Sequence, residues 1–327
     1  MKKVSKAVVT GGAGFIGSHI VDELIKRGIE TFVIDNLTTG TMENLKQHKT
    51  NDLFHFFLGD AKNIEHFLFN INDIDVVFHQ SAITSIPRSI NDPMIVHDAN
   101  VNTTLNVMNY CVSKNVKKFI FASSAAVYGK LENQKASEEF VCWPSSPYGA
   151  SKLAVEDYLK AYQLTYELEP VILRYFNVYG SRQLMNDYSG VITIFINQLL
   201  SGEPPTIFGD GSQVRDFIHV QDIVHANMLA MENENATGKI FNVATGNSMS
   251  VLELLKTLKE ITKTENIKHK FEPPRRGDVK ISLAENDKIK NTLSFSPTIS
   301  SIEGLKQLVG YFRSMQEIKM LSQYGKK

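Results

Sequence analysis

The chain has 327 residues with a formal net charge of zero, and 43% of its residues are hydrophobic and 21% charged. At roughly 100–200 residues per domain, this length predicts one large domain or two closely joined ones. The balanced charge argues against nucleic acid or an anionic membrane as a partner, and no apolar run approaches the about 18 residues of a membrane span.

The first residues, MKKVSK, lead directly into a strand-like VVT and show no secretory signal pattern. Only two cysteines occur in the sequence, Cys111 and Cys142, which argues against a disulfide framework. We therefore expect a protein of the reducing cytoplasm.

Short, nearly continuous apolar runs alternate with helical patterns in the first half of the chain. Strands are predicted at residues 7–10, 31–34, 55–58, 76–79, 118–122 and 170–174. Helices are predicted at residues 16–27, 96–114 and 148–167. Strands that are apolar on both faces suit a parallel sheet covered by helices on both sides. The alternation predicts the α/β class, with a Rossmann-type doubly wound parallel sheet.

The composition changes after about Tyr179, where Gly, Pro and Asp become frequent. A late strand is predicted at 240–244, and helices at 251–263 and 301–320. We predict a nucleotide-binding domain over 1–178, to which parts of about 220–246 return. Residues 179–327 would form mainly a smaller, interleaved α+β part that binds the substrate.

The first strand runs into the glycine-rich turn TGGAGFIG. Two overlapping patterns, G-x-G-x-x-G and G-x-x-G-x-x-G, use Gly11, Gly12, Gly14 and Gly17. Glycine allows the tight turn and the approach of a pyrophosphate to the backbone at a helix N-terminus. Asp35 ends the next strand and would accept hydrogen bonds from ribose hydroxyls, which favours NAD over NADP. Asp60 ends the third strand and could either bond the adenine amine or serve as a plain turn residue.

The segment SSPYGASK places Tyr148 and Lys152 four residues apart, on one face of a predicted helix. A free phenol has a pKa of about 10, too high for a base at neutral pH. The lysine ammonium and an oxidised nicotinamide would both favour the phenolate. Such pairs occur by chance on many helices, but the preceding strand ends in the hydroxyls of Ser123 and Ser124. That edge of an open α/β sheet is where ligands bind, so we interpret the group as a catalytic site.

Taken together, TGGAGFIGSH, Asp35, Gly59-Asp60, HQSA, SSAAVYG, YGASK and RYFNVYG fall in the order and spacing of the extended short-chain dehydrogenases/reductases. The chain resembles this family over nearly its whole length. More narrowly, GDGSQVRDFIHVQDI and RRGD resemble the nucleotide-sugar epimerase branch, which includes UDP-glucose and UDP-N-acetylglucosamine 4-epimerases.

The resemblance implies that Tyr148 is the catalytic base, Lys152 its partner and Ser124 the proton relay. It implies NAD contacts from Gly11, Gly14, Phe15, Ile16, Gly17, Asp35, Asn36, Gly40, Asp60, Ala61, Gln80, Ser81, Ala82, Asn100, Ser123, Tyr148, Lys152, Tyr175, Phe176 and Val178. It implies contacts with a UDP-sugar from Ser85, Arg88, Ser124, Tyr148, Asn177, Gln213, Arg215, Arg276, Asp278 and Ser282. The two arginines Arg215 and Arg276 would bind the diphosphate. No paired spacing of metal ligands is found, so no metal is expected.

The reaction implied by this resemblance is inversion at C4 of the sugar through a transient 4-keto sugar, with NAD regenerated in each turnover. Related dehydratases and decarboxylases carry acidic residues after the catalytic hydroxyl, where this chain has Ala125 and Ala126. Ser282 should leave room for an N-acetyl group, and the segment 85–90 resembles the substrate loop of N-acetylhexosamine epimerases. We therefore expect UDP-N-acetylglucosamine to be accepted beside, or in preference to, UDP-glucose. UDP-glucuronate is an alternative, because Arg88 could meet a carboxylate.

Two other functions fit the same motifs. One is a dehydrogenase that uses free NAD as a co-substrate, and the other is a non-catalytic nucleotide-sugar sensor, against which the presence of Ser124, Tyr148 and Lys152 argues. The long predicted helices 96–114 and 148–167 carry apolar stripes. These predict a homodimer through a four-helix bundle, unless both stripes only cover the sheet.

Overall fold

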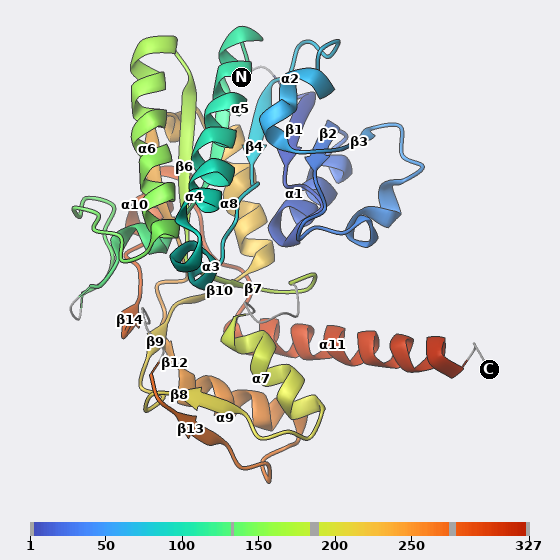
Figure 1. The fold of residues 1–327 in the computed structure, drawn as a ribbon, viewed down its shortest axis with the longest axis vertical. Helices are drawn as coiled ribbons and strands as arrows, with labels where there is room; N and C mark the ends of the chain where they lie inside the picture. The colour runs from blue at the N-terminus through green and yellow to red at the C-terminus, as the bar shows by residue number, and fades with distance from the viewer. Residues whose placement is uncertain (1–2, 132–133, 184–189, 275–278, 325–327) are drawn as a thin grey trace.

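The fold is built on a seven-stranded parallel sheet with helices on both faces, as the computed structural model shows for residues 3–131, 134–183, 190–274 and 279–324 (Figure 1). The strands lie in the order β11-β6-β5-β4-β1-β2-β3. Their bounds are β1 Lys6–Thr10, β2 Glu30–Asp35, β3 Phe54–Leu58, β4 Val76–His79, β5 Lys118–Ser124, β6 Glu169–Tyr175 and β11 Lys239–Val243. Every strand predicted from the apolar runs is present, within two residues at each end. The predicted fold class is confirmed.

Burial on both faces explains why these strands read as continuous apolar runs. Val8 and Val9 of β1 are both fully buried, although they point to opposite faces of the sheet. In register, Thr10 of β1 is paired with Ile34 of β2 and with His79 of β4. Gly11 after β1, Asp35 at the end of β2 and Gln80 after β4 therefore lie at one common edge of the sheet.

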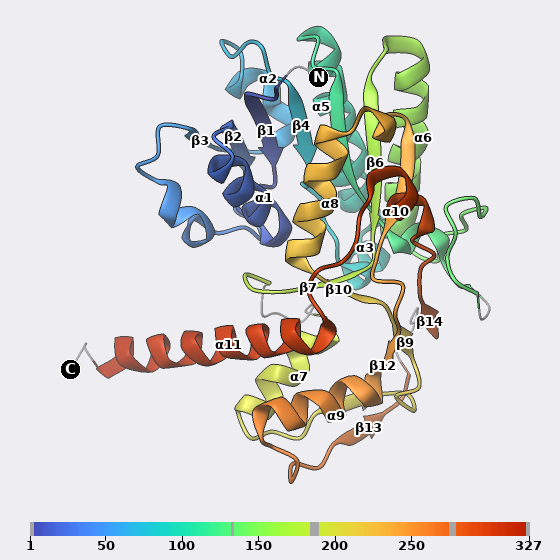
Figure 2. The ribbon, with the colours of Figure 1, turned by 180° about the vertical axis from the view of Figure 1, so that it is seen from behind.

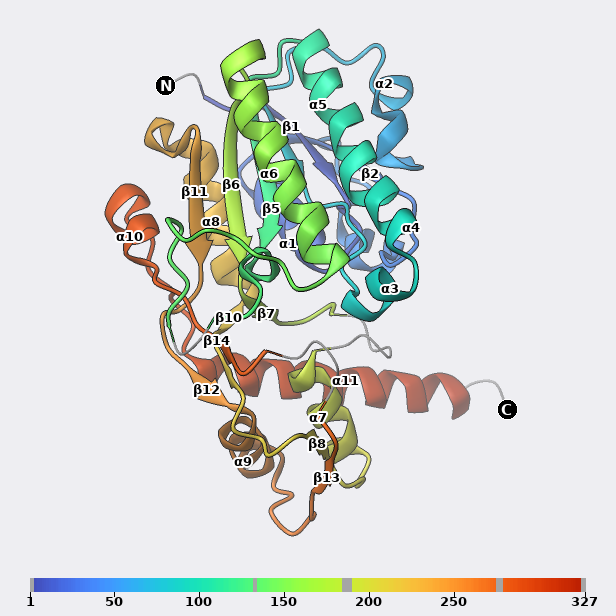
Figure 3. The ribbon, with the colours of Figure 1, turned by 60° about the vertical axis from the view of Figure 1, so that its left-hand side comes forward.

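Helices cover the two faces in separate groups. The helices α1 (Phe15–Lys26) and α8 (Val220–Glu232) lie on one face (Figure 2). The other face is covered by α2 (Ile64–Phe67), α5 (Thr103–Ser113) and α6 (Pro147–Tyr166) (Figure 3). The predicted helix 96–114 is instead α4 (Pro93–His97), a π-helical turn, η3 (Asp98–Asn102), and α5. Short helical segments complete this part: η1 Met42–His48, η2 Ala61–Asn63, α3 Ile86–Asn91, η4 Ala125–Tyr128 and η5 Glu234–Ala236.

A second, smaller hydrophobic core lies beyond the carboxyl edge of the sheet. It is formed by α7 (Val191–Leu200), α9 (Val251–Thr262) and the first half of α11 (Ser301–Tyr324), through buried residues such as Phe195, Leu254 and Leu308. Short strands accompany these helices: β7 Asn177–Tyr179, β8 Thr206–Phe208, β9 Val214–Arg215, β10 Phe217–His219, β12 Met249–Ser250, β13 Lys270–Glu272 and β14 Ile281–Ser282. The helix α10 (Asp287–Leu293) packs near β11. Figures 1 and 2 show α11 passing beneath the sheet-bearing part.

The chain returns to the sheet after entering the second part. β11 pairs with β6, with Lys239 opposite Val171 and Val243 opposite Tyr175, and α8 packs against α1. Both α8 and β11 lie within the segment 220–246 that was expected to return to the nucleotide-binding domain. The domain boundary between residues 178 and 179 stays a prediction. Among the described residues, no helix is long and apolar enough to cross a membrane.

Candidate active site

The glycine-rich turn packs closely against the loop after β4. Gly11 has φ of +70°, and a Cβ there would lie 2.7 Å from the backbone nitrogen of Ser81. A Cβ on Gly17 would lie 2.2 Å from the carbonyl oxygen of Gly11. Gly14 precedes α1 without a side-chain cap, and the first turn holds no acidic residue. The helix therefore presents its positive end, beginning at Phe15 and Ile16, to whatever binds over the turn.

Asp35 sits beside this turn at the end of β2, where it is buried. Its carboxylate accepts hydrogen bonds from the backbone N–H groups of Ala13 at 2.9 Å and Leu37 at 2.8 Å. Burial raises the pKa of Asp35, and these backbone hydrogen bonds lower it. Gly40 belongs to the same corner, because a Cβ there would lie 2.9 Å from the Asp35 Oδ1 atom. Asn36 accepts from the backbone N–H of Thr38 at 3.0 Å and so shapes the connecting turn.

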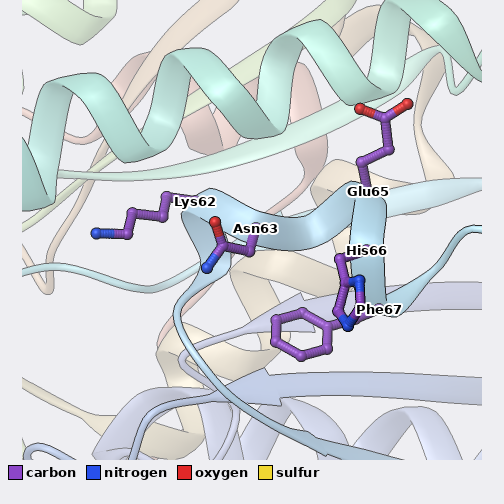
Figure 4. Close-up of a pocket in the computed structure, with 5 residues that line it drawn as sticks. All are labelled: Lys62, Asn63, Glu65, His66 and Phe67. Atoms are coloured by element: carbon purple, nitrogen blue, oxygen red, sulfur yellow. The ribbon is translucent and has the colours of Figure 1, made fainter.

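Asp60 acts as a helix cap in this structure. Its side chain caps η2 by accepting a hydrogen bond from the backbone N–H of Lys62 at 3.0 Å, next to buried Ala61. This is the plain turn role that the sequence analysis gave as one of two alternatives. The adjoining surface hollow is lined by Lys62, Asn63, Glu65, His66 and Phe67 (Figure 4). These side chains point in different directions rather than toward one point, so the hollow is not a candidate site.

The loop after β4 carries Gln80, Ser81 and Ala82 along the edge of the sheet. Gln80 donates from Nε2 to the hydroxyl of Tyr175 at 3.3 Å. Asn100 in the π-helical turn clamps the loop, because it accepts from the backbone N–H of Ile83 at 2.8 Å and donates to its carbonyl at 3.0 Å. Asn100 also donates to the Ser151 hydroxyl at 2.9 Å and so connects the loop to α6.

Farther along the same loop, Ser85 caps α3 by accepting from the backbone N–H of Arg88 at 3.1 Å. Both residues are half-buried. They were expected to contact the sugar, and this expectation stays a prediction.

The predicted catalytic residues come together where α6 meets the end of β5. Ser146 caps α6 through the backbone N–H of Gly149 at 3.1 Å, and Pro147 opens the helix, so buried Tyr148 lies in its first turn. The Ser124 hydroxyl lies close enough to the Tyr148 phenol to act on its pKa. Lys152, one turn later, is also buried and donates to the Ala122 carbonyl at 2.8 Å. These contacts place a hydroxyl pair and a lysine at one strand end.

Burial dominates the protonation of both groups. It lowers the pKa of Lys152 to about 7, although the nearby charge of Glu156 raises it. It raises the pKa of Tyr148, and the Ser124 hydroxyl lowers it. The sequence led us to expect that Lys152 would bring the phenol toward neutral pH. In the structure the largest influence on Tyr148 acts in the opposite direction, because desolvation disfavours a buried phenolate.

Next to Ser124, Tyr148 and Lys152 lies a buried ion pair that the sequence analysis did not predict. Glu156 on α6 accepts from Arg174 on β6 at 3.0 Å and 2.6 Å, and from the Ser123 hydroxyl at 2.5 Å. Glu156 is fully buried and Arg174 nearly so. The side chain of Ser123 is thus engaged with Glu156, which leaves its backbone for the expected cofactor contact. Glu156 follows Lys152 by four residues, and that spacing on the buried helix face was the signal available in the sequence.

Residues after β6 line the approach to the second part. The hydroxyl of Tyr175 accepts from Asn227 at 2.8 Å, and burial raises the pKa of Tyr175 to about 12. Phe176 is buried, with its ring 6.4 Å from that of Tyr128, and half-buried Val178 follows in β7. These positions agree with a packed wall rather than with exposed loop residues.

On the substrate side, residues far apart in the sequence meet. Asn177 donates from Nδ2 to the hydroxyl of Ser282 at 3.3 Å, and Ser282 is paired with Arg215 in the β9–β14 ladder. Arg215 donates to the backbone carbonyl of Val214 at 2.9 Å. Gln213 donates to the carbonyl of Phe208. Arg276 and Asp278 lie outside the described residues.

Comparison with known proteins places this arrangement in a family. Residues 7–244 match the model of the NAD dependent epimerase/dehydratase family. The chain belongs to this family. This match confirms the family resemblance that the motifs indicated. It also confirms the prediction that the cofactor is NAD.

Three relatives illustrate the range of sugars. The chain is 34% identical to a UDP-glucose 4-epimerase of Mycolicibacterium smegmatis over 95% of this chain and 100% of the relative. A crystal structure of UDP-N-acetylglucosamine 4-epimerase from Methanobrevibacter ruminantium M1, in complex with UDP-N-acetylmuramic acid, is 39% identical, with a TM-score of 0.90 over 96% of this chain and 99% of that one. UDP-glucuronic acid 4-epimerase from Bacillus cereus, in complex with UDP-glucuronic acid and NAD, is 32% identical, with a TM-score of 0.88 over 95% and 99%.

The buried lysine gives a prediction for stability against pH. The folded pKa of Lys152 is about 7, below its ordinary value of 10.5, so the unfolded chain holds one more proton between these values. The stability contributed by neutral Lys152 is therefore present near pH 10 and lost as the pH falls toward 7. We expect wild type to gain unfolding free energy relative to Lys152→Met as the pH rises from about 7 to about 9.5, in urea titrations of nucleotide-free protein.

The control for this experiment is Lys160→Met on the same helix, because the Lys160 side chain is 52% exposed. Its difference from wild type should not vary over the same pH range. If the Lys152→Met difference were equally flat, the burial argument would be wrong.

Proposed function

We propose that this protein is a UDP-hexose 4-epimerase that inverts C4 of the sugar through a transient 4-keto intermediate. The observation that carries the proposal is that buried Tyr148 lies beside the half-buried hydroxyl of Ser124, one helical turn from buried Lys152, at the edge of the sheet. This edge also carries the glycine turn. Ligands of open α/β sheets bind at this position.

The residues at the turn fit NAD. A Cβ on Gly11 or Gly17 would meet neighbouring backbone, so the turn needs glycine at both positions. The start of α1 has no side-chain cap and could receive a pyrophosphate, and the Asp35 carboxylate lies beside the turn. Gln80, Ser81 and Ala82 would line the bound molecule from the β4 side, and Tyr175, Phe176 and Val178 from the β6 side. When bound, NAD supplies a reversible hydride acceptor for the sugar carbon.

The residues of this chain would carry out the proton transfer. Tyr148 would take the proton of the sugar 4-hydroxyl as the phenolate, with Ser124 passing the proton between sugar and ring. Because burial in the chain alone raises the pKa of Tyr148, the phenolate depends on positive charge close by. Protonated Lys152 supplies one such charge, and the pyridinium ring of oxidised NAD carries another. After the sugar turns over, Tyr148 would return the proton to the C4 oxygen, and the return of the hydride to the other face of the C4 carbon would complete the inversion.

For the 4-keto sugar to rotate in the site, the nucleotide must be bound tightly and the hexose only loosely. Arg215 and Arg276 would bind the diphosphate, because a guanidinium offers two parallel donors to phosphate oxygens. Asp278 would contact the uridine ribose. Asn177 and the small side chain of Ser282 would border the hexose.

Replacement of Tyr148 tests the reaction. Tyr148→Phe removes the proton acceptor and keeps the ring that fills the buried site. We expect turnover of a UDP-hexose to fall by at least about a thousandfold, within the range typical of a lost acid–base group, while NAD remains bound. Product analysis by chromatography and the nucleotide content of the purified protein provide the measurement. Unchanged turnover in this variant would reject Tyr148 as the base.

The same assay separates the proposal from its rivals. An epimerase produces no net NADH, whereas a dehydrogenase that consumes free NAD raises the absorbance of the reduced nicotinamide. A sensor binds a UDP-sugar and converts none. Elimination of water or of carbon dioxide is disfavoured because the two residues after Ser124 are Ala125 and Ala126, and neither side chain is an acid or a base.

We propose that UDP-N-acetylglucosamine is accepted beside, or in preference to, UDP-glucose, because Ser282 is small where it meets Asn177. Incubation with UDP-N-acetylglucosamine, UDP-glucose and UDP-glucuronate should show turnover of the first. Ser282→Tyr should abolish turnover of the N-acetyl sugar and spare UDP-glucose, and Ser282→Ala should spare both. Turnover of UDP-glucose alone by the wild type would reject the preference, and turnover of UDP-glucuronate alone would favour a role for half-buried Arg88.

We also propose a homodimer through α5 and α6. These neighbouring helices are joined by the Tyr162 hydroxyl, which donates to Asn109 at 2.6 Å. They expose apolar side chains, among them Val112 at 37%, Tyr158 at 44% and Leu164 at 88%. Pairing these helices with those of a second copy would cover this surface. Leu164→Glu should convert a dimer to a monomer in light scattering, whereas Ile302→Glu on α11, where Ile302 is 55% exposed, should not. Equal masses for the two variants would contradict the proposal.

A further inference from the structure

Two aspartates in the segment GDGSQVRDFIHVQDI have no place in the proposed chemistry, although both are fully buried. Asp216 follows the predicted diphosphate ligand Arg215, and Asp222 lies in the first turn of α8. A buried carboxylate is costly unless hydrogen bonds satisfy it. The partners of each aspartate therefore indicate what it holds in place.

The side chain of Asp216 is bound to the end of the central sheet. Its Oδ1 atom accepts from the backbone N–H of Thr245 at 2.9 Å and from the Thr245 hydroxyl at 2.7 Å, and Oδ2 accepts from the backbone N–H of Gly246 at 2.8 Å. Thr245 and Gly246 lie just after β11. The carboxylate thus ties the segment 214–216 to the carboxyl edge of the sheet.

The main chain of the same residue holds the predicted substrate contacts. The carbonyl of Asp216 accepts from the backbone N–H of Asn177 at 3.2 Å and from its side-chain Nδ2 at 3.0 Å. The backbone N–H of Asp216 donates to the carbonyl of Ser282 at 2.8 Å. One residue therefore connects the sheet edge to Asn177 and Ser282, and directly follows Arg215.

We propose that Asp216 is a positioning residue for the UDP-sugar. By anchoring its own backbone to the end of β11, it sets the distance of Asn177, Arg215 and Ser282 from the edge where Tyr148 and Ser124 lie. The inference rests on the proposed function, since it assumes that these three residues meet the UDP-sugar. Loss of the anchor should weaken the binding of UDP while NAD stays bound.

Asp222 provides a matched control, because its hydrogen bonds have the same pattern. Its Oδ1 atom accepts from the backbone N–H of Thr298 at 2.7 Å and from the Thr298 hydroxyl at 2.9 Å, and Oδ2 accepts from the backbone N–H of Ile299 at 3.4 Å. These bonds tie α8 to the segment before α11. None of the predicted site residues takes part in them.

The test compares Thr245→Val with Thr298→Val in the NAD-bound full chain. Each substitution removes one hydroxyl bond to a buried aspartate and should lower the melting temperature to a similar degree. Thr245→Val should also raise the Kd for UDP in calorimetry, and KM for the UDP-sugar, by about tenfold, the effect typical of a lost hydrogen bond to a charged group. Thr298→Val should leave Kd and KM unchanged. Bound NAD should be the same in both.

Asp216→Asn and Asp222→Asn form a second pair, needed because the Thr245 hydroxyl also accepts from the backbone N–H of Asn247 at 3.1 Å. Asp216→Asn should weaken UDP binding, and Asp222→Asn should not. If Asp216→Asn does not fold, the comparison of Thr245→Val with Thr298→Val still tests the proposal.

Equal Kd values for UDP in the matched variants would overturn the positioning role and leave the proposed function intact. Wild type that binds UDP but converts no UDP-sugar would overturn the epimerase proposal alone, since the Kd comparison still tests Asp216. Wild type that neither binds UDP nor converts a UDP-sugar would overturn both.

Discussion

The buried carboxylate of Glu156 is the contact on which the arrangement of the site depends. It receives Arg174 from β6 and Ser123 from β5 while it is carried by α6, so three elements are joined at one side chain. Removing one partner of such a pair leaves an unpaired buried charge, at a cost of about 3–5 kcal/mol. The neighbours of Ser123 in the chain are Ala122, which accepts from Lys152, and Ser124, whose hydroxyl lowers the pKa of Tyr148. The positions of Ser124, Tyr148 and Lys152 therefore depend on the hydrogen bonds of Glu156, in which none of these three residues takes part.

Local signals in the sequence predicted the elements well where one physical cause dominates. Burial on both faces marked the strands, and the amphipathic pattern of residues 148–167 marked α6. Asp35 was found because a strand end brings it to the glycine turn. The break of the predicted helix 96–114 was not found, because the apolar pattern runs through the π-helical turn without interruption. The burial that raises the pKa of Tyr148 in the protein chain alone was not predicted, because desolvation depends on packing, which residue spacing does not report.

The substrate side was harder to predict for a different reason. Asn177, Arg215 and Ser282 meet through strands of two or three residues, too short to leave a periodic pattern. Their roles were inferred from resemblance, and the structure adds the bonds between them. Glu156 and Asp216 were missed because an isolated acidic residue in a sequence is usually exposed. Only the three-dimensional packing distinguishes a carboxylate that holds two elements together from one that faces water.

The π-helical turn between α4 and α5 has a consequence for how this chain tolerates deletions. Such a turn contains one residue more than an α-helical path between the same ends. Shortening η3 by one residue would leave a regular helix between the same ends and remove the wide turn that carries Asn100. The hydrogen bonds of Asn100 with Ile83 and Ser151 would then be lost. A shorter, locally more regular chain would thus release the loop after β4 from α6, so the position of this loop depends on the extra residue of the π-helical turn.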